Sequence, residues 1–423
     1  MSVTSVILGL GSNLDPLFHL RKALLEIRNQ PELVIKKISR IYESEALTIN
    51  NSTQPSYLNA CLLLEVKNFD PTVFLAQIKQ IEKKIGRQKR EKWHSREIDL
   101  DILYVIQENH PIFFKNEYIQ IPHNEFFNRA FTFFPAKEVF LDLNNINHLK
   151  MNESCKVSNK YFWPQFSGIL NITPDSFSDG GLFNSEENMF KQIHMLMNAG
   201  SDFIDIGAES TRPGAEIISI NTELARLKSA LNLIKDFDIK VSIDSRNYET
   251  VKFCLENFKV DMINDVSGFS DQRIFQLIKD YKVKAVCMHS LSIPANPMKN
   301  LNDNLNPIDE LNNWWSEKTK IFIKNNLDLE NIYFDPGIGF GKTAEQSHFI
   351  LKNLNQLNLV LSPVYLGYSR KSFYNYFETN PANKKDFETA MTTAQINLAY
   401  AQVIRVHDVH LQKRALRMCH EFY

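Results

Sequence analysis

The sequence predicts an α+β domain followed by a (β/α)8 TIM barrel. The first ~150 residues mix strand and helix patterns without a fixed rhythm, and residues 144–162 are polar and aperiodic. From Gly168 onward, short apolar strands alternate regularly with helical segments. A chain of 423 residues is long enough for two or three domains. We expect a first domain at 1–150, a linker at 151–163 and a barrel at 164–423.

The elements of the first domain follow from periodicity and from signals at helix ends. Pro71 and Gly86 stand at the start and end of one helical pattern, where helices favour proline and glycine. Strands are expected at 5–13, 57–68 and 95–107, and helices at 16–29 and 71–86.

The second half repeats one unit eight times, each a short apolar strand followed by a helix. Eight such units in ~255 residues match the size and pattern of a (β/α)8 barrel. Strands are expected at 168–173, 202–207, 240–245, 261–266, 284–289, 331–337, 363–369 and 403–409. Helices are expected at 189–200, 222–237, 248–258, 273–281, 310–326, 346–358, 388–402 and 411–422.

Composition and charge limit the classes of partner. The chain has 43% hydrophobic and 23% charged residues, which is ordinary for a globular protein. Its 48 basic and 49 acidic residues nearly cancel, so we expect no nucleic-acid and no membrane partner. Five scattered cysteines without CxxC spacing favour a reducing compartment over a disulfide framework or a zinc site. No apolar stretch reaches the ~20 residues of a membrane span, and we expect a cytoplasmic protein.

Polar side chains stand where nearly every predicted barrel strand ends. Active sites of this fold lie at the carboxyl ends of its strands, so we expect these side chains to form one. They are Asn171, Glu209, Asp244, Asn264, His289, Asp335, Ser369 with Arg370 and Lys371, and Arg405 with His407.

Two aspartates, Asp99 and Asp101, interrupt the strand at 95–107. Side chains two positions apart share a face of a strand, so this pair is either a solvated acidic stripe or a site. Five basic residues within positions 87–96 favour a site, because two carboxylates beside a basic loop suit Mg²⁺ bound to phosphates. The five are Arg87, Lys89, Arg90, Lys92 and Arg96, and Trp93 lies among them.

Two glycine-rich stretches resemble nucleotide motifs but fail them. "GLGSNL" has Leu14 where the dinucleotide fingerprint needs glycine, and "PGIGFGKT" has Pro336 where a phosphate loop needs one. Neither predicts a Rossmann or P-loop site.

The first half resembles 6-hydroxymethyl-7,8-dihydropterin pyrophosphokinase over roughly residues 3–145, through "GSNL", "QPSYLNA", "IEKKIGRQKREKWHSREIDLDIL" and "IPHNEFFNRAF". That family has a ferredoxin-like α+β fold. The resemblance implies that Asp99 and Asp101 hold two Mg²⁺ ions and that Arg87 and Arg96 bind ATP phosphates, these four being catalytic. It adds Glu82, Trp93, His123 and Arg129 to the ATP site, and implies that Tyr57, Asn59 and Phe131 bind the pterin.

The second half resembles dihydropteroate synthase along nearly its whole length, through "GILNITPDSFSDGG", "GAESTRPGA", "DPGIGFGK", "SRKS" and "IRVHDV". The resemblance implies that Asn171 ligates one Mg²⁺ on a pyrophosphate, which Arg212, Arg405 and His407 also bind. The pterin would be held by Asp244, Asn264, Met288, Asp335 and Lys371. The p-aminobenzoate would lie among Phe177, Thr211, Pro213, Phe340 and Lys371, with Asp175 and Lys371 catalytic.

Two positions depart from the second family. The segment 288–290 reads "MHS" where a second methionine is common, and Ala208 stands where glycine often occurs. Both changes are conservative in size. In "HDVH" at 407–410, a metal site is one interpretation, but a phosphate contact by His407 with Asp408 structural fits better.

The sequence therefore predicts a bifunctional folate-pathway enzyme. The first domain would transfer pyrophosphate from ATP to 6-hydroxymethyl-7,8-dihydropterin. The barrel would condense the product with p-aminobenzoate to give 7,8-dihydropteroate. Two alternatives stay open: a pterin-dependent methyltransferase, and a pterin-binding or scaffolding protein with one dead site. By analogy with other barrels of this kind, we expect a homodimer through the barrel.

Overall fold

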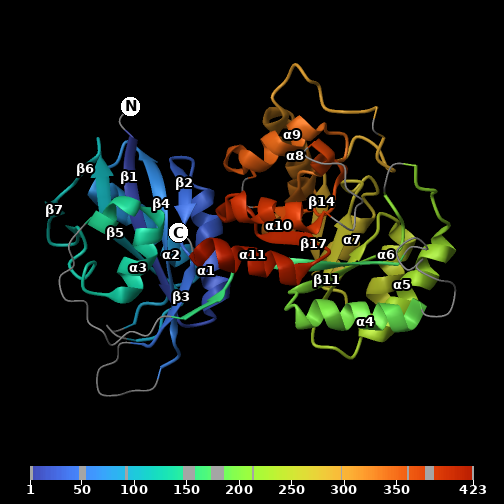
Figure 1. Ribbon diagram of the computed structural model, residues 1–423, viewed down its shortest axis with the longest axis horizontal. Helices are drawn as coiled ribbons and strands as arrows, with labels where there is room; N and C mark the ends of the chain where they lie inside the picture. The colour runs from blue at the N-terminus through green and yellow to red at the C-terminus, as the bar shows by residue number, and fades with distance from the viewer. Residues whose placement is uncertain are drawn as a thin grey trace. The chain divides into compact units, whose positions relative to one another are not determined.

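The computed structural model describes residues 3–46, 54–90, 94–145, 158–172, 185–211, 214–296, 298–359, 362–376 and 385–421. The chain forms two compact units (Figure 1). The first comprises Met1–Trp163 with Asn397–Tyr400, and the second comprises Pro164–Ile396 with Ala401–Phe422. Among the described helices, none is long and apolar enough to cross a membrane.

The first unit is built on an antiparallel sheet in which β1 lies between β4 and β5. The chain order β1-α1-β2-β4-α2-β5 and the sheet order β5-β1-β4-β2 are those of a ferredoxin-like fold, as expected. The elements are β1 (Val3–Ser12), α1 (Pro16–Arg28), β2 (Leu33–Ile38), β3 (Ile41–Ser44), β4 (Tyr57–Lys67), α2 (Pro71–Ile85), β5 (Asp99–Gln107), β6 (His110–Pro111), β7 (Phe114–Lys115), β8 (Gln120–Ile121), α3 (Ala130–Val139) and the 3-10 turn η1 (Leu141–Asn145).

Both ends of α2 are fixed locally. The Asp70 side chain accepts hydrogen bonds from the backbone N–H groups of Thr72 and Val73, and Gly86 ends the helix in the left-handed region at φ 111°. On one face of the sheet, α3 packs Phe133 and Ala136 against Ile7. Because α3 covers only part of that face, the portion near the end of β1 is left for a cavity.

Residues 158–161, which we expected in the linker, form the strand β9 (Ser158–Tyr161) instead. This strand pairs antiparallel with β3, with Tyr161 opposite Ile41 and Ser158 opposite Glu43. An edge strand is held by backbone hydrogen bonds, which do not depend on side-chain polarity. The polar sequence of β9 therefore shows no alternation of apolar residues from which the strand could be predicted. The other expected linker residues at 151–157 lie outside the described residues.

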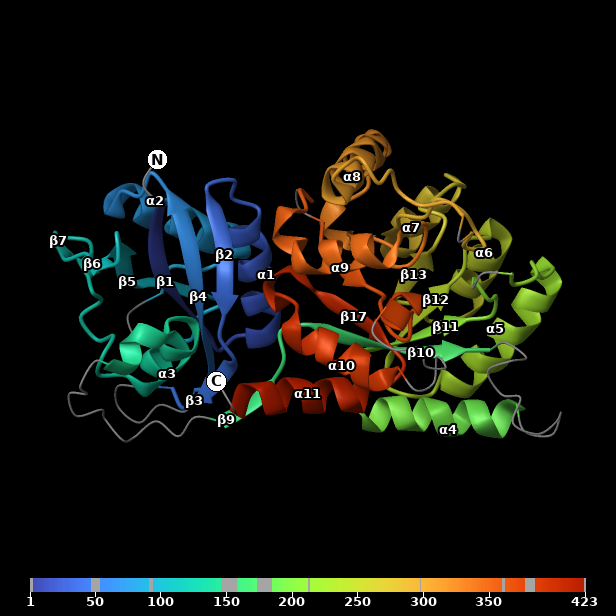
Figure 2. The ribbon, with the colours of Figure 1, turned by 45° about the horizontal axis from the view of Figure 1, so that its top comes forward.

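The second unit is the predicted barrel, which the structure confirms (Figure 2). Eight parallel strands follow the order β15-β14-β13-β12-β11-β10-β17-β16, and a parallel bridge between Phe334 and Val364 joins the two ends. The strands are β10 (Gln165–Asn171), β11 (Phe203–Gly207), β12 (Lys240–Asp244), β13 (Met262–Asp265), β14 (Lys284–Met288), β15 (Ile332–Asp335), β16 (Tyr365–Leu366) and β17 (Val403–Val406).

Helices follow the barrel strands as predicted. They are α4 (Ser185–Asn198), α5 (Ile220–Ile234), α6 (Tyr248–Asn257), α7 (Ile274–Tyr281), α8 (Pro307–Lys324), α9 (Ala344–Lys352), α10 (Asp386–Gln395) and α11 (Val409–Glu421), with 3-10 turns at Leu329–Asn331, Leu354–Gln356, Ser372–Tyr376 and Leu398–Tyr400. The barrel interior includes a layer formed by Phe203, Met262, Val286, Tyr333, Tyr365 and Val403. This packing fixes the strand ends on which the polar side chains stand.

Candidate active sites

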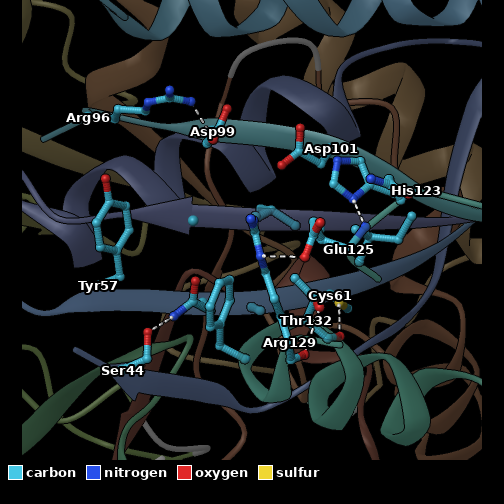
Figure 3. A pocket seen from close by; sticks show the side chains of 18 of the residues that line it. Ser44, Tyr57, Cys61, Arg96, Asp99, Asp101, His123, Glu125, Arg129 and Thr132 are labelled. Atoms are coloured by element: carbon cyan, nitrogen blue, oxygen red, sulfur yellow. Dashed lines mark hydrogen bonds and ion pairs between the residues drawn. The ribbon is translucent and has the colours of Figure 1, made fainter. Parts of the chain in front are cut away.

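A cavity of about 730 Å³ lies in the first unit, over the end of β1 that α3 leaves uncovered (Figure 3). Its floor is a sheet surface with little side-chain bulk. Gly9 of β1 lies between Cys61 of β4 and Asp101 of β5, and Gly11 lies between Asn59 and Asp99. Of the predicted site residues, it brings together Tyr57, Asn59, Arg87, Arg96, Asp99, Asp101, His123, Arg129 and Phe131.

The two glycines explain the stretch "GLGSNL" that failed as a nucleotide fingerprint. A Cβ on Gly9 would lie 2.9 Å from the Leu103 side chain, and one on Gly11 would lie 3.3 Å from the Asn59 amide oxygen. Directly opposed residues of antiparallel strands share a face, so both glycines keep the space beside the aspartates open. The sequence signal was glycine at alternate positions of a strand.

The aspartate pair lies beside two arginines, as the sequence predicted. Asp99 makes ion pairs with Arg87 at 2.8 Å and Arg96 at 2.6 Å. Burial, and then the neighbouring Asp99, raise the pKa of Asp101 to about 7. A carboxyl held so close to neutral pH needs added positive charge to stay ionised, which a cation or metal would supply.

The donor set fits Mg²⁺ and does not fit a metal held by protein side chains alone. Within the described residues, no group of three or more His, Cys, Asp or Glu side chains is arranged to hold a metal ion. Two carboxylates on one face of β5 are hard oxygen donors of the kind that Mg²⁺ prefers when phosphate and water complete its coordination.

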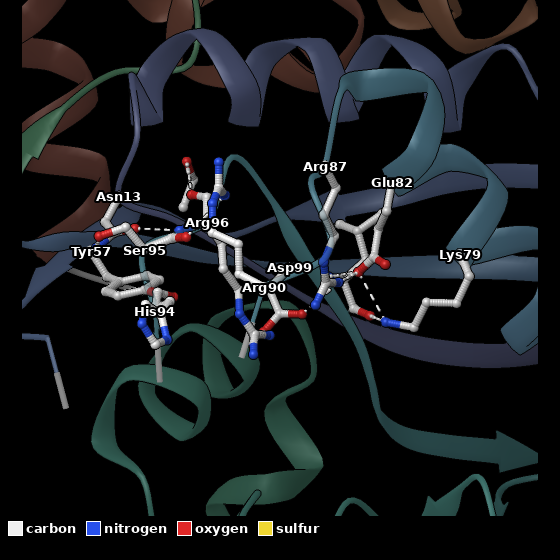
Figure 4. Close-up of polar contacts among 12 residues, drawn as sticks. Asn13, Tyr57, Lys79, Glu82, Arg87, Arg90, His94, Ser95, Arg96 and Asp99 are labelled. Atoms are coloured by element: carbon white, nitrogen blue, oxygen red, sulfur yellow. Dashed lines mark hydrogen bonds and ion pairs between the residues drawn. The ribbon is translucent and has the colours of Figure 1, made fainter. Parts of the chain in front are cut away.

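Glu82, which the resemblance adds to the ATP site, is not among the residues that line the cavity. Its side chain is 3% exposed and lies beneath the cavity, where it does not line the wall. One carboxylate oxygen accepts hydrogen bonds from the Leu100 backbone N–H at 2.8 Å, from Lys79 at 3.0 Å, and from Arg87 (Figure 4). Glu82 therefore holds Arg87 against Asp99, a role that a linear pattern of charges does not reveal.

Two further residues of the first site were missed by sequence reasoning. Lys79 lines the cavity, and its charge lowers the pKa of Asp101. Asn13 orders the loop that carries Arg96: its amide oxygen accepts from the Arg96 backbone N–H at 2.8 Å, and its amide nitrogen donates to Ser95 at 3.1 Å (Figure 4). The one sequence pattern that could have indicated Lys79 was its position three residues before Glu82, because side chains at that spacing are neighbours on a helix.

For the pyrophosphokinase activity that the sequence resemblance implies, we expect Glu82→Gln to lower AMP formation by roughly 10- to 100-fold, because the neutral amide no longer orients Arg87 by charge. The measurement is the rate of AMP release from ATP and 6-hydroxymethyl-7,8-dihydropterin. Glu65→Gln is the matched control, since Glu65 is 39% exposed and pairs with Lys36 on the same unit. An unchanged rate for Glu82→Gln would mean that Arg87 needs no such support.

The remaining predicted residues of the first site border the cavity. Asn59 is buried and donates to Ser44 at 2.9 Å, which fixes its amide. The pKa of His123 is lowered by burial and by Arg129, and its Nδ1 accepts from the Glu125 backbone N–H at 3.3 Å. Trp93 lies outside the described residues.

At the barrel mouth, Arg405 is held by two carboxylates. It pairs with Asp205 at 2.5 Å and with Asp244 at 2.8 Å. Asn264 donates to Asp205 at 3.2 Å. Asp205 was not predicted because it lies inside β11 with its side chain in the barrel interior, away from the strand end that sequence reasoning searched.

Burial governs the two predicted carboxyl groups of the barrel. Burial raises the pKa of Asp244 to about 7, and Arg405 is the main group that opposes this rise. Burial raises the pKa of Asp335 to about 6, and the Gly337 N–H and Lys371 oppose that rise. Asp335 accepts from that N–H at 2.7 Å. A ligand that donates hydrogen bonds to these groups in the buried mouth would favour their charged forms.

Lys371 lies beside an apolar wall. Its ammonium is 4.1 Å from the centroid of the Phe340 ring, and Phe340 packs with Met288. This places a cation, an aromatic ring and a thioether together, next to the carboxyl groups of the mouth.

The anion side of the mouth is described in part. His407 Nδ1 lies 2.9 Å from the Ser369 hydroxyl, and Asp408 accepts from the Leu411 backbone N–H at 2.8 Å at the start of α11. Asp408 therefore has a structural contact, as predicted for "HDVH". Asn171 ends β10, and Thr211 accepts a backbone hydrogen bond from Ala295 at 3.2 Å. The predicted residues Asp175, Phe177, Arg212 and Pro213 lie outside the described residues.

These features define a two-domain enzyme with a carboxylate–arginine site suited to metal and phosphates, and a second site at a barrel mouth. Family models match each part: the pterin binding enzyme family matches residues 167–407, and 7,8-dihydro-6-hydroxymethylpterin-pyrophosphokinase matches residues 7–140. The chain therefore belongs to the pterin binding enzyme family, with a pyrophosphokinase domain preceding the barrel.

Named relatives match the whole chain or its second part. The chain is 28% identical over 438 residues to the folate synthesis bifunctional protein of Chlamydia caviae, covering 97% of this chain and 96% of that protein. It is 38% identical over 247 residues to the dihydropteroate synthase of Synechocystis, covering 57% of this chain and 84% of that protein.

Solved structures resemble the barrel part. Dihydropteroate synthase from Anaplasma phagocytophilum, with bound 6-hydroxymethylpterin-monophosphate, has a TM-score of 0.56 and 29% identity, covering 62% of this chain and 100% of that one. The enzyme from Xanthomonas albilineans, with 4-aminobenzoic acid, has a TM-score of 0.56 and 27% identity, covering 61% and 93%.

Proposed function

We propose that this chain catalyses two successive steps of folate biosynthesis. The first unit transfers a pyrophosphoryl group from ATP to 6-hydroxymethyl-7,8-dihydropterin and releases AMP. The barrel condenses that product with p-aminobenzoate and releases 7,8-dihydropteroate and pyrophosphate. The observation that carries the proposal is the pairing, in one chain, of a pyrophosphokinase domain and a pterin-binding barrel, matched over 97% of its length by a bifunctional relative.

In the first step, the pterin hydroxymethyl oxygen attacks the β-phosphorus of ATP, and the bond from that phosphorus to the α-phosphate oxygen breaks. Two Mg²⁺ ions, held by Asp99 and Asp101, would supply charge neutralisation at the triphosphate. Arg87 and Arg96 would turn from Asp99 to the phosphates, where they stabilise the charge that moves onto AMP. His123 and Arg129 would bind the nucleotide.

Three residues of the same cavity would hold the pterin for this step. Tyr57 and Phe131 offer rings for stacking on its faces, and Asn59 offers an amide to its hydrogen-bonding edge. Together, these three side chains would orient the hydroxymethyl oxygen of the pterin toward the β-phosphorus of ATP.

In the second step, the bond between the pterin methylene carbon and the pyrophosphate oxygen breaks, and the aryl amine nitrogen bonds to that carbon and loses a proton. Arg405 and His407, with Arg212, would bind the departing pyrophosphate, and Asn171 would help hold one Mg²⁺ ion that neutralises it. Carboxylates Asp244 and Asp335, with Asn264 and Lys371, would bind the pterin edge. Phe340 with Thr211, Phe177 and Pro213 would surround the p-aminobenzoate, near Asp175.

One assay tests the proposal. The protein is incubated with ATP, Mg²⁺, 6-hydroxymethyl-7,8-dihydropterin and p-aminobenzoate, and AMP and dihydropteroate are followed together. We expect both products, in equal amounts at completion. AMP without dihydropteroate would favour a protein with a dead barrel site, and absence of both products would favour one with a dead first site. Methyl transfer from a methylated pterin, supplied separately, would favour the methyltransferase alternative.

A further inference from the structure

A buried lysine, Lys342, lies at the end of the glycine-rich loop 336–342 in the barrel. It is 6% exposed, and its ammonium donates to the Phe340 carbonyl at 3.0 Å. The same nitrogen lies 2.9 Å from Nδ1 of His289. Burying a charged lysine costs free energy unless its N–H groups find hydrogen-bond acceptors. These two contacts supply such acceptors for the buried ammonium.

His289 is the matching acceptor. It is 4% exposed, and burial followed by Lys342 lowers its pKa to about 3, so the ring is neutral. The Trp314 ring, with its centroid 5.0 Å from that of His289, closes one side of the imidazole to water. A protonated lysine can only donate, so Nδ1 of His289 accepts and Nε2 carries the proton.

The pair closes the loop against the segment that follows β14. Gly337 has φ 65°, and a Cβ there would overlap the His289 carbonyl oxygen. Gly341 has φ 67°, and a Cβ there would lie 2.7 Å from Leu291. These positions need glycine because the loop packs directly against residues 289–291, and the contacts of Lys342 hold its last turn there. The loop in turn sets the ring of Phe340 beside Lys371.

The same lysine acts on Asp335 through its charge. Burial raises the pKa of Asp335, and Lys342 is among the groups that oppose the rise. The others are the Gly337 N–H, Lys371 and Arg405. Removal of the Lys342 charge would therefore let the pKa of Asp335 rise further.

Other charged groups face the two residues. Burial lowers the pKa of Lys342 to about 7, while Asp335 and Glu310 favour its charged form and Lys371 disfavours it.

We propose that Lys342 and His289 form a positioning pair for the condensation step, which fixes the loop carrying Phe340 and keeps Asp335 anionic to accept hydrogen bonds from the pterin. This inference rests on the proposed function of the barrel. Lys342 and His289 are positioning residues and not catalytic ones, because they act through Phe340 and Asp335.

The test measures kcat/KM for the pterin pyrophosphate ester between pH 5 and 9, with saturating p-aminobenzoate. The wild-type value is expected to fall toward acid pH as the buried carboxylates Asp244 and Asp335 take up protons. In Lys342→Gln, we expect this acid limb to move upward by about one pH unit, because a nearby positive charge is lost. His289→Met should move it in the same direction by less. Lys320→Gln, on an exposed lysine of α8 with 68% side-chain exposure, should not move it.

AMP formation by the same variants reports that the first unit is intact, and their thermal unfolding compared with the wild type reports whether the barrel is folded. A Lys342→Gln protein that loses rate equally at every pH, with an unmoved acid limb, overturns the inference. If Lys342→Gln does not fold, His289→Met decides, and an unmoved limb in that variant overturns it as well. A wild-type protein that forms no dihydropteroate from the supplied ester contradicts the proposed function instead.

Discussion

Asp101→Ala is expected to abolish AMP formation while leaving the condensation of supplied pterin pyrophosphate ester unchanged. Asp101 shares one face of β5 with Asp99, beside the open floor that Gly9 and Gly11 provide. A metal ion contributes several kcal/mol of charge stabilisation in a transition state. Since about 1.4 kcal/mol is a factor of ten, loss of its ligand should lower the rate by at least ~10³-fold. The measurements are AMP release and dihydropteroate formation on the same preparation.

Asp142→Ala is the matched control, because Asp142 is an exposed carboxylate of the same unit. It should retain both activities. AMP formation by Asp101→Ala at close to the wild-type rate would contradict the assignment of the carboxylate pair. Loss of both activities in a folded Asp101→Ala protein would contradict the independence of the two sites.

Lys371→Ala is expected to have the reverse effect: condensation falls by roughly 10²- to 10³-fold, and AMP formation stays unchanged. The substitution removes the ammonium that lies 4.1 Å from the Phe340 ring, and with it a charge that lowers the pKa of Asp335. The proposed hydrogen bond from Lys371 to the pterin is then lost, and the pKa of Asp335 rises. The measurement is the rate of dihydropteroate formation from the supplied ester at pH 8.

Lys252→Ala provides the comparison, because Lys252 has 45% side-chain exposure on α6 and pairs with Glu256. It should condense at the wild-type rate. If Lys371→Ala condenses the ester as fast as Lys252→Ala does, the assignment of Lys371 to the barrel site is wrong.

The barrel could be predicted from the sequence because its strands are buried on both sides and read as short apolar runs. Each run ends at a polar residue such as Asp244 or Asp335, and parallel strands bring those ends to one face. Asp99 and Asp101 could be predicted as a pair because side chains two positions apart on a strand lie on the same face.

Other features depend on contacts that no local pattern records. Asp205 lies in mid-strand and is recognised as part of the mouth only when Arg405 is seen to pair with it. Glu82 lies beneath the cavity and supports Arg87, because the buried end of α2 turns it away from the open space. The edge strand β9 is held by backbone hydrogen bonds to β3, which are independent of side-chain pattern.

The most direct test of the two-step account follows one phosphorus atom through both reactions. The protein is given ATP labelled at the β-phosphate, together with Mg²⁺ and 6-hydroxymethyl-7,8-dihydropterin, and p-aminobenzoate is added later. We expect the label to enter a pterin ester while AMP stays unlabelled, and then to leave as pyrophosphate in equal amount to dihydropteroate once p-aminobenzoate is present. Label recovered in ADP, or held in the ester after p-aminobenzoate is added, would contradict the account.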